Sequence, residues 1–301
     1  MTDDAWFADL DPGDRDAAAE RIRDGNAESP ADWPTLAVES GFAADEDDYY
    51  DRLREATLAA GRAAVSEREG AEDQQLVHAV RAMDDCRRQA NELAERVAEW
   101  GGSRFESAGT GVEYARELAA RDPETAGVPA SEASGGSSEL RSDGDRRAVS
   151  LARRVVELDA EADALREYVE TTTPEVAPNL AALAGPVLAA RLISLAGGLE
   201  SLAKKPSGTV QVLGAEDALF AHLRGDAPSP KHGIIYTHDA VRSTRPEDRG
   251  SAARALAGKL AIAARIDHYS GDRRPDLEAE LDERIATIQA RADGDGEGDD
   301  E

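Results

Sequence analysis

Apolar residues recur at helical spacing along most of the chain, and the clearest example lies between residues 72 and 100. An apolar residue stands at every third or fourth position there, as expected for one face of a helix. This stripe consists of Leu76, Val80, Met83, Cys86, Ala90, Leu93, Val97 and Trp100. A second stripe, within residues 146–171, consists of Val149, Ala152, Val155, Leu158, Ala162, Leu165 and Val169. Because each stripe needs an apolar partner, the two helices are predicted to form an antiparallel hairpin.

The two stripes are too long for a small neighbouring domain to cover. We therefore expect the hairpin to mediate self-association of the chain as a homodimer. The residues expected at that interface are Leu76, Val80, Met83, Leu93, Val97, Leu158 and Leu165.

Residues 1–70 form an acidic region that predicts a small N-terminal domain of α or α/β class. Helices are expected over residues 14–23 and 47–65, and the pattern also allows a short β-hairpin around residues 36–38. Six of the 13 aromatic residues fall in this region, enough for a very small core. Because seventy residues are close to the lower limit for independent folding, we expect this domain to dock on a partner protein.

The hairpin region is expected to span residues 71–173 and to contain an irregular insertion. After a short helix at 112–120, the segment 127–144 holds nine Gly or Ser residues and little apolar content. Such a composition is typical of a flexible loop, which is predicted over residues 121–146.

Residues 174–275 predict an all-helical globular domain. Helices are expected over 179–195, 214–223 and 247–266, while the apolar run 233–236 is compatible with a strand or a buried extended loop.

The last segment, residues 276–301, is expected to lie outside that domain. An exposed amphipathic helix over 275–291 is followed by an acidic, Gly-rich tail that is predicted to be disordered. The fold class predicted for the whole chain is mainly α, with a small N-terminal domain, a long helical hairpin and an all-helical C-terminal domain.

The formal net charge is −27, and the acidic residues are spread over the whole chain. Together with abundant Ala and scarce Lys, this charge is typical of a cytoplasmic protein from a salt-loving organism, whose surface carboxylates keep it hydrated. The alternative is an acidic, partly disordered protein from an ordinary cell. The start, Met1-Thr2-Asp3-Asp4, lacks the basic and apolar regions of a signal sequence, and no window approaches 18 uninterrupted apolar residues. We therefore expect a cytoplasmic protein.

Positive charge is concentrated in one part of the sequence. All four lysines, Lys204, Lys205, Lys231 and Lys259, lie within residues 179–275. That segment holds 13 Lys and Arg residues against 9 Asp and Glu residues, a net charge of +4. A positive segment inside so acidic a chain predicts an anionic partner, and nucleic acid is the obvious one.

Not every cation in this segment is expected to face that partner. The pair Lys204-Lys205 is compatible with a phosphate contact or with a solvated helix end. Along one predicted helix, cations recur at intervals of five, five and six residues, a spacing that makes no single narrow stripe; they are Arg249, Arg254, Lys259 and Arg265. Some of them should face the partner, and others should pair with local acids.

The sequence contains no catalytic or metal-binding arrangement that we recognise. No G-x-x-x-x-G-K-[ST] loop occurs, and no G-x-G-x-x-G follows a predicted strand. The single cysteine, Cys86, excludes an intramolecular disulfide and a Cys-based zinc site. The spacing of His232, His238 and Asp239 fits no common metal or catalytic site, so we expect a structural or RNA-contacting role for His232.

Ordered phrases across residues 177–267 resemble the Nop domain, the RNA–protein-binding module of box C/D ribonucleoproteins and of a related spliceosomal factor. The phrases are Ala177-Pro178-Asn179-Leu180, Gly185-Pro186, Ala190-Arg191-Leu192-Ile193-Ser194, Gly208-Thr209-Val210-Gln211-Val212-Leu213-Gly214-Ala215-Glu216, Pro230-Lys231-His232-Gly233 and Ala263-Ala264-Arg265-Ile266-Asp267. The helix over residues 79–100 is similar to the first coiled-coil helix of the same family. The chain therefore resembles an archaeal Nop-family core protein almost end to end.

The resemblance implies a scaffold that is not an enzyme and needs no cofactor. In this family the hairpin dimerises, and the Nop domain grips a box C/D guide RNA together with a kink-turn-binding ribosomal-type protein. The N-terminal domain carries fibrillarin, the S-adenosylmethionine-dependent 2′-O-methyltransferase that modifies ribosomal and, in some archaea, transfer RNA. The residues expected to contact RNA or a partner are Lys204, Lys205, Gln211, Gly214, Ala215, Glu216, Lys231, His232, Arg249, Arg254 and Lys259.

The chain departs from the family pattern at several positions. Asp217 stands where the family phrase G-A-E-K has Lys, and Ala221 stands where Arg usually follows Ala-Leu-Phe. The phrase over residues 101–105 is degraded, and the N-terminal region is shorter than usual. Two other functions stay open: a purely protein-binding helical scaffold whose positive segment balances acidic neighbours, and an RNA-modifying enzyme.

Overall fold

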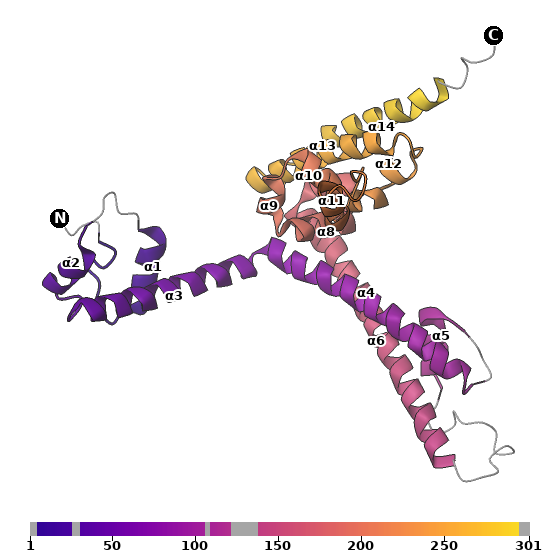
Figure 1. Cartoon of the computed structure of the whole chain (residues 1–301), viewed down its shortest axis with the longest axis horizontal. Helices are drawn as coiled ribbons and strands as arrows, with labels where there is room; N and C mark the ends of the chain where they lie inside the picture. The colour runs from indigo at the N-terminus through magenta and orange to yellow at the C-terminus, as the bar shows by residue number, and fades with distance from the viewer. Residues whose placement is uncertain (1–4, 26–30, 106–108, 122–137, 295–301) are drawn as a thin grey trace. The chain divides into compact units, whose positions relative to one another are not determined.

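The computed structural model describes residues 5–25, 31–105, 109–121 and 138–294, with the backbone alone for residues 138–142 and 291–294. Within these residues all regular secondary structure is helical, which confirms the mainly α fold class (Figure 1). The chain divides into two compact units, Met1–Gln74 and Gln75–Glu301, called unit 1 and unit 2 below.

Unit 1 contains three helices around an aromatic core. They are α1 (Arg15–Asp24), α2 (Trp33–Glu39) and α3 (Glu46–Gly70), and both α1 and α2 pack against α3. Phe7, Phe42 and Tyr49 are buried, with the Phe7 and Phe42 rings stacked at 5.2 Å between centroids. A core this small depends on such large rings, because few other bulky side chains are present.

The expected β-hairpin around residues 36–38 is wrong, since these residues belong to α2. Two signals start this helix: the Asp32 carboxylate accepts a hydrogen bond from the Thr35 amide at 3.4 Å, and Pro34 lies in the first turn. An N-capping Asp followed by Pro favours a helix start over a strand.

The predicted helical hairpin is formed by α4 (Glu72–Gly102) and α6 (Ser138–Val176), with α5 (Gly111–Ala119) between them in the chain. It belongs to unit 2 except for the first three residues of α4. Near the end of the hairpin α4 buries Ala90, Ala94 and Val97 in one cluster with α5 and with apolar residues of α6. Asp159 of α6 is buried and forms ion pairs with Arg87 of α4 and Arg116 of α5. The carboxylate therefore joins all three helices.

The predicted flexible loop over 121–146 is wrong for residues 138–146, which begin α6, and its residues 122–137 lie outside the described part of the chain. Tertiary contacts account for the helix despite its Gly and Ser content. Asp145 is buried and pairs with Arg104, and the guanidinium of Arg104 lies so close to Gly144 that a Cβ atom there would be 2.5 Å from Nη2. Such contacts outweigh a weak local preference.

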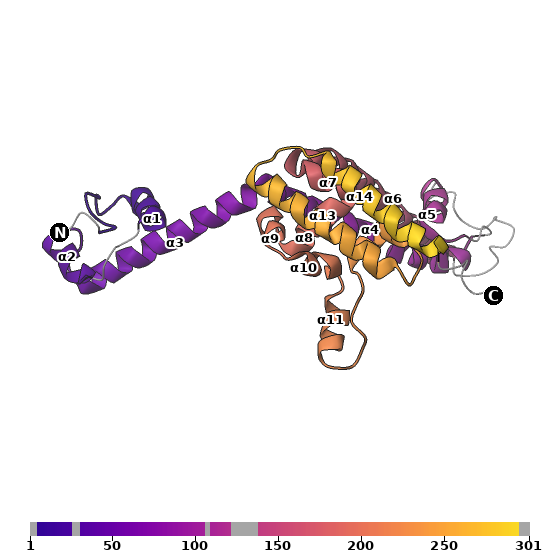
Figure 2. The same ribbon diagram turned by 90° about the horizontal axis from the view of Figure 1, so that it is seen from above.

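The C-terminal part of unit 2 is built from short helices around one long one. The short helices are α7 (Pro178–Ala184), α8 (Pro186–Ala196), α9 (Leu199–Ala203), α10 (Ser207–Val212), α11 (Glu216–Leu223), the 3-10 helix η2 (Ile234–Thr237) and α12 (Asp239–Arg242). The long helix α13 (Arg249–Tyr269) packs against α7, α9, α10, α12 and the final helix α14 (Asp276–Gly294). Figure 2 shows α11 standing away from the other helices, and none of its residues is buried.

Two expectations for the first part of this region are corrected. The single helix expected over 179–195 is two helices, because Gly185 adopts φ +76° and Pro186 starts a new helix after a bend of 117°. The run 233–236 is neither strand nor extended loop, because Gly233 precedes the 3-10 helix η2 and residues 234–236 belong to it.

The helix expected to be exposed over 275–291 is α14, and it docks on the core instead. Its apolar residues recur at intervals of four, four and three, so they form one face that packs with α13. The buried residues of that face are Leu277, Leu281, Ile285 and Ile288. The tail beyond residue 294 lies outside the described residues.

Within the described residues, no single helix has the length and hydropathy of a membrane span. The pair α7 and α8 meets that test only when the two bent helices are counted together. Most of their apolar side chains, such as Leu180, Leu192 and Ile193, lie in the core of unit 2.

The base of the hairpin and the C-terminal helices share one apolar core. Leu76, Val80 and Met83 of α4 are buried in the same cluster as Leu256 and Leu260 of α13. The guanidinium of Arg81 adds a polar tie by donating to the hydroxyl of Ser194 at 3.0 Å and to its carbonyl at 3.1 Å.

Candidate nucleic-acid interface

A loop that carries Lys231 and His232 is fixed against the end of α10 by backbone hydrogen bonds. The Gly233 amide donates to the Gln211 carbonyl at 2.8 Å, and the Ile234 amide donates to the Leu213 carbonyl at 2.7 Å. The side-chain Nε2 of Gln211 donates a hydrogen bond to the Lys231 carbonyl at 2.6 Å. At Gly233 a Cβ atom would lie 1.9 Å from the Leu213 carbonyl oxygen. Only glycine allows this approach, so the position of Lys231 and His232 depends on it.

An aromatic and cationic cluster forms directly beside this loop. The His232 and Tyr236 rings stack at 4.6 Å between centroids, inclined by 20°. The Arg249 guanidinium carbon lies 5.4 Å from the Tyr236 ring centroid, and Arg249 is held by a bond from Nε to the Thr244 carbonyl at 3.0 Å. Flat rings and a guanidinium together suit stacking against a base, while the cation also suits a phosphate.

The surroundings of His232 favour its neutral form. Burial lowers its pKa below the usual 6.5, a backbone hydrogen bond opposes this decrease, and the positive charges of Arg249 and Lys231 lower the pKa further. The neutral imidazole can both donate and accept a hydrogen bond. The positive charge of the cluster therefore comes from Lys231 and Arg249.

The exposed face of α13 extends the cluster. The Cδ atom of Lys231 lies 3.9 Å from the place of a Cβ atom at Gly250. Arg254 follows one helical turn later; it is exposed, and no ion pair occupies it within the described part of the chain. Arg265 comes three turns after Arg254 on the same face, and its guanidinium donates to the Lys205 carbonyl at 3.3 Å. This face therefore carries a cation near each end.

Two of the sequence-predicted lysines are already paired. Lys204 donates to Glu200 at 2.6 Å, and this hydrogen bond raises its pKa. Lys259 pairs with Glu280 of α14, and only 21% of its side chain is exposed. Because residues five apart on a helix point about 140° away from each other, Lys259 does not share the face of Arg254.

The segment Gly214-Ala215-Glu216 forms a fixed turn beside η2. Gly214 adopts φ +80°, and a Cβ atom there would lie 3.3 Å from Cβ of Ile234. The Glu216 carboxylate accepts a hydrogen bond from the Gly214 amide at 2.9 Å. The turn leads into α11, which begins at Glu216 and whose exposed large apolar residues are Phe220 and Leu223.

Of the seven residues predicted to mediate self-association, four are buried in the core and three are only partly buried. Leu76, Val80 and Met83 are buried against the C-terminal helices, and Val97 is buried against α6. These four side chains have their partners inside the same chain. The three that are only partly buried are Leu93, Leu158 and Leu165.

Two residues that organise this region are not among those predicted from the sequence. Tyr236 belongs to an apolar run, yet its ring contacts both His232 and Arg249. Its position four residues after His232, which ends a family phrase with Gly233, is the one feature of the sequence that could have identified it. Asp267 is buried and receives the amides of Asn179 and Leu180 at the start of α7. Burial raises the pKa of Asp267, and these hydrogen bonds oppose the increase.

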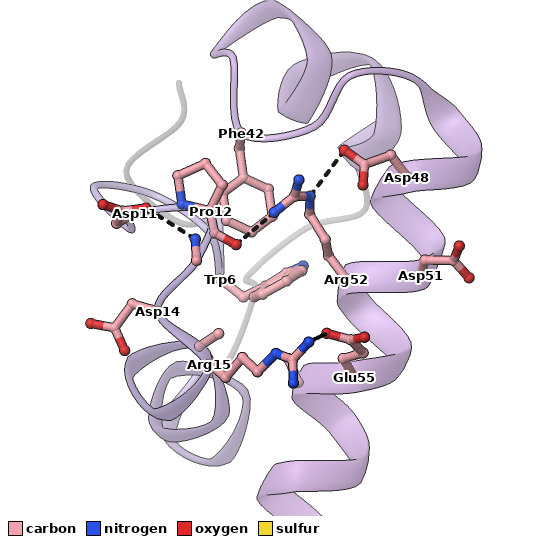
Figure 3. Close-up of a pocket in the computed structure, with 13 residues that line it drawn as sticks. Trp6, Asp11, Pro12, Asp14, Arg15, Phe42, Asp48, Asp51, Arg52 and Glu55 are labelled. Atoms are coloured by element: carbon pink, nitrogen blue, oxygen red, sulfur yellow. Dashed lines mark hydrogen bonds and ion pairs between the residues drawn. The ribbon is translucent and has the colours of Figure 1, made fainter.

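Unit 1 contains a separate cavity of about 600 Å³ between α1 and α3 (Figure 3). Trp6 and Phe42 line it together with five carboxylates and two guanidinium groups. Both guanidinium groups are engaged internally, Arg15 with Glu55 at 3.1 Å and Arg52 with Asp48 at 3.0 Å. Within the described residues, no group of three or more His, Cys, Asp or Glu side chains is placed to hold a metal ion.

Comparison with known proteins gives a family match over most of unit 2. Residues 116–289 match the Nop family, described as "snoRNA binding domain, fibrillarin". An uncharacterised NOP5 family protein of Methanocaldococcus jannaschii is 48% identical over 143 residues, which cover 48% of this chain and 34% of that protein. Nucleolar protein 58 of Scheffersomyces stipitis is 32% identical over 246 residues, which cover 73% of this chain and 48% of that protein. The chain thus spans less than half the length of these relatives.

Among solved structures, one chain of a fibrillarin/Nop5p complex is 25% identical and matches 90% of this chain and 91% of its own length. The TM-score is 0.47, too low for the two chains to be compared element by element.

Proposed function

Since this chain belongs to the Nop family, we propose that it is a non-catalytic scaffold of a box C/D guide ribonucleoprotein. Unit 2 binds the guide RNA together with a kink-turn-binding protein, and unit 1 recruits a fibrillarin-type methyltransferase. S-adenosylmethionine belongs to that enzyme, which methylates ribose 2′-hydroxyls of ribosomal or transfer RNA. The assembly works in the cytoplasm of a salt-loving cell.

The observation that carries this proposal is the cluster of Lys231, His232, Tyr236 and Arg249, which lies inside the family match. It combines the exposed Lys231 and the half-buried Arg249 with stacked rings beside a loop that Gly233 fixes in place. Such a surface can contact a phosphate and an unpaired base at once. A surface that only balances acidic neighbours would need no such stacking.

RNA binding in high salt must depend on short contacts. Near molar ionic strength the Debye length is about 3 Å, so a small excess of positive charge attracts RNA weakly from a distance. Counterion release also contributes little when the bulk salt concentration is high. We therefore expect the isolated chain to bind guide RNA weakly, and a kink-turn protein already bound to the RNA to complete the surface.

The hairpin supplies self-association in this proposal, through the partly buried Leu93, Leu158 and Leu165. Replacing Leu93 and Leu165 with Glu would put charges at that seam, which costs several kcal/mol when they are buried. Sedimentation of the full chain in multimolar salt measures the effect. A wild-type chain that stays monomeric at high micromolar concentration contradicts this part of the proposal.

The test of RNA binding uses two matched lysine variants. Affinity for a box C/D guide RNA is measured with and without the kink-turn protein, in KCl from about 0.5 to 3 M, which spans the screening regimes. Lys231→Gln should weaken binding to the composite by about three- to tenfold, as expected for one charge-assisted contact. Lys259→Gln removes the same charge from the side that pairs with α14 and should leave affinity unchanged.

Two results would contradict the RNA-binding proposal. Tight binding by the isolated chain at every salt concentration, unaffected by the second protein, contradicts the composite surface. No binding in either condition, with protein partners still bound, favours a scaffold that contacts proteins alone.

A further inference from the structure

Helix α3 carries an exposed apolar strip, formed by Tyr50, Leu58 and Val65. These side chains are 51%, 49% and 61% exposed, and the only other exposed large apolar residue among the described residues of unit 1 is Val38. Intervals of eight and seven residues place all three on one side of the helix, over a length of about 22 Å. Exposed apolar residues gathered on one face are typical of a binding surface.

The strip lies on the side of α3 that faces away from the core of unit 1. The buried residues of α3 are Tyr49, Ala56 and Ala60, and they point to the opposite side of the helix. Figures 1 and 2 show α1 and α2 packed along the same helix. Their contacts leave Leu58 and Val65 exposed, so unit 1 does not cover its own strip.

The charges around the strip are unusual for this chain. Residues 56–66 include no Asp or Glu, although the whole chain has 62 acidic residues among 301. The charged residues one helical turn before and after Leu58 are Arg54 and Arg62, both exposed, while the exposed acids Asp47 and Glu69 lie at the two ends of the strip. The nearest preceding acid, Glu55, pairs with Arg15 of α1 at 3.1 Å. The middle of the strip thus lacks carboxylates in a chain that is otherwise rich in them, which indicates that this part of the surface is covered in the assembly.

A second copy of the same strip is a poor partner for it. Antiparallel pairing about Leu58 places Arg54 of one chain opposite Arg62 of the other, four residues to either side of the centre. Parallel pairing in register places each arginine against itself. Both arrangements bring like charges together across an apolar contact, which is unfavourable. The complementary surface is apolar with carboxylates along its edges.

We propose that this strip docks a separate protein, through an apolar surface or helix of that protein flanked by Asp or Glu side chains. Leu58 sits at the centre of the contact, and Arg54 and Arg62 pair with the flanking carboxylates. The identity of the partner as the fibrillarin-type methyltransferase rests on the proposed function. The existence of the contact rests on the strip itself.

The first experiment measures binding of the full chain to the recombinant methyltransferase by calorimetry in molar KCl. The double variant Leu58→Glu with Val65→Glu should weaken binding by about thirtyfold or more, as expected for central interface residues. The control Val38→Glu changes the one other exposed large apolar residue in the described part of unit 1 and should stay within about twofold. Arg54→Glu with Arg62→Glu should weaken binding, whereas Arg54→Lys with Arg62→Lys should restore most of it. Circular dichroism checks that each variant keeps its helix content.

If the methyltransferase binds but the strip variants bind like the wild type, the proposed surface is wrong and the proposed function stands. If wild-type chain and methyltransferase do not bind at all, recruitment by unit 1 is wrong, and a second experiment decides about the strip. In that experiment p-benzoylphenylalanine replaces Leu58 in the full chain within its own cells, and crosslinked peptides are identified by mass spectrometry.

A crosslink to an apolar segment of another protein with flanking carboxylates supports the strip as a docking surface. A crosslink to unit 2 of the same chain, a crosslink to a second copy, or the absence of any crosslink overturns the proposal.

Discussion

Replacing Asp267 with Asn should destabilise unit 2 by about 3 kcal/mol. The Asp267 side chain is 8% exposed and joins the end of α13 to the start of α7. One carboxylate oxygen accepts the Asn179 amide at 3.0 Å and the Asn179 side-chain nitrogen at 2.6 Å, while the other accepts the Leu180 amide at 2.9 Å. Two backbone donors that a helix start leaves without partners are thus satisfied by one side chain.

The size of this loss in stability follows from the hydrogen bonds that an Asn side chain at position 267 cannot accept. Asn keeps one acceptor oxygen, and its NH₂ group then faces a backbone N–H that also donates. Losing a hydrogen bond to a charged group costs about 1.5–3 kcal/mol, and a buried donor left without an acceptor costs about 1–3 kcal/mol more. Burial already raises the pKa of Asp267, so removing a poorly solvated charge offsets part of this loss. A net effect of about 3 kcal/mol remains.

The measurement is native-state hydrogen exchange of the full chain, read by mass spectrometry of peptides from α7 and α13. These peptides report unit 2 separately from unit 1, which a single melting curve does not do. The matched control is Asp282→Asn on the exposed side of α14. If Asp267→Asn lowers the opening free energy by no more than the control does, the hydrogen bonds of Asp267 do not stabilise unit 2 as argued.

Three further predictions concern single residues. Gly233→Ala should displace the loop from the Leu213 carbonyl and weaken RNA binding more than it lowers overall helix content, so unchanged affinity in a filter assay would contradict the close approach of the two backbones. Asp159→Ala should cost roughly 2 kcal/mol, because two half-exposed arginines lose one buried partner, and an unchanged opening free energy in hydrogen exchange of peptides from α4 and α6 would show that the ion pairs contribute nothing. For His232 the folded pKa is lowered, so its contribution to stability is lost as the pH falls through and below the unfolded value of 6.5. An NMR titration of the imidazole should give a midpoint below 6.5, and a midpoint above 6.5 would contradict its burial beside two cations.

Long periodic helices are predictable from the sequence because their apolar spacing depends on packing alone. The stripes around Val80 and Val155 correctly predict α4 and α6, and Asp14 correctly marks the start of α1. Elements whose form depends on distant contacts are not predictable in this way. Residues 138–146 are helical because Asp145 meets Arg104, and that pairing has no local signal.

The sequence predicts which residues belong to the candidate interface better than it predicts how their side chains are arranged. Family phrases select Gln211, Lys231 and His232, which the structure brings together, but they do not show that Lys259 pairs with Glu280. The angle of about 140° between Arg254 and Lys259 around the helix does predict that the two side chains face different ways. The sequence does not predict the ion-pair partner of Lys259, because Glu280 lies on α14, a helix that is expected to be exposed. The self-association of the hairpin stays a prediction, now limited to residues that the chain does not bury for itself.

The core shared by α4 and α13 has a consequence for synthesis of the chain. Leu76 leaves the ribosome long before Leu260, whose side chain belongs to the same cluster. At about 5–20 residues per second, the gap of 184 residues lasts roughly 10–40 s. During that time the first apolar stripe has emerged without its final partner, whereas every residue of the unit 1 core has already emerged. A nascent chain stalled before α13 should therefore attract chaperones through α4, and releasing it after α13 has emerged should end that binding.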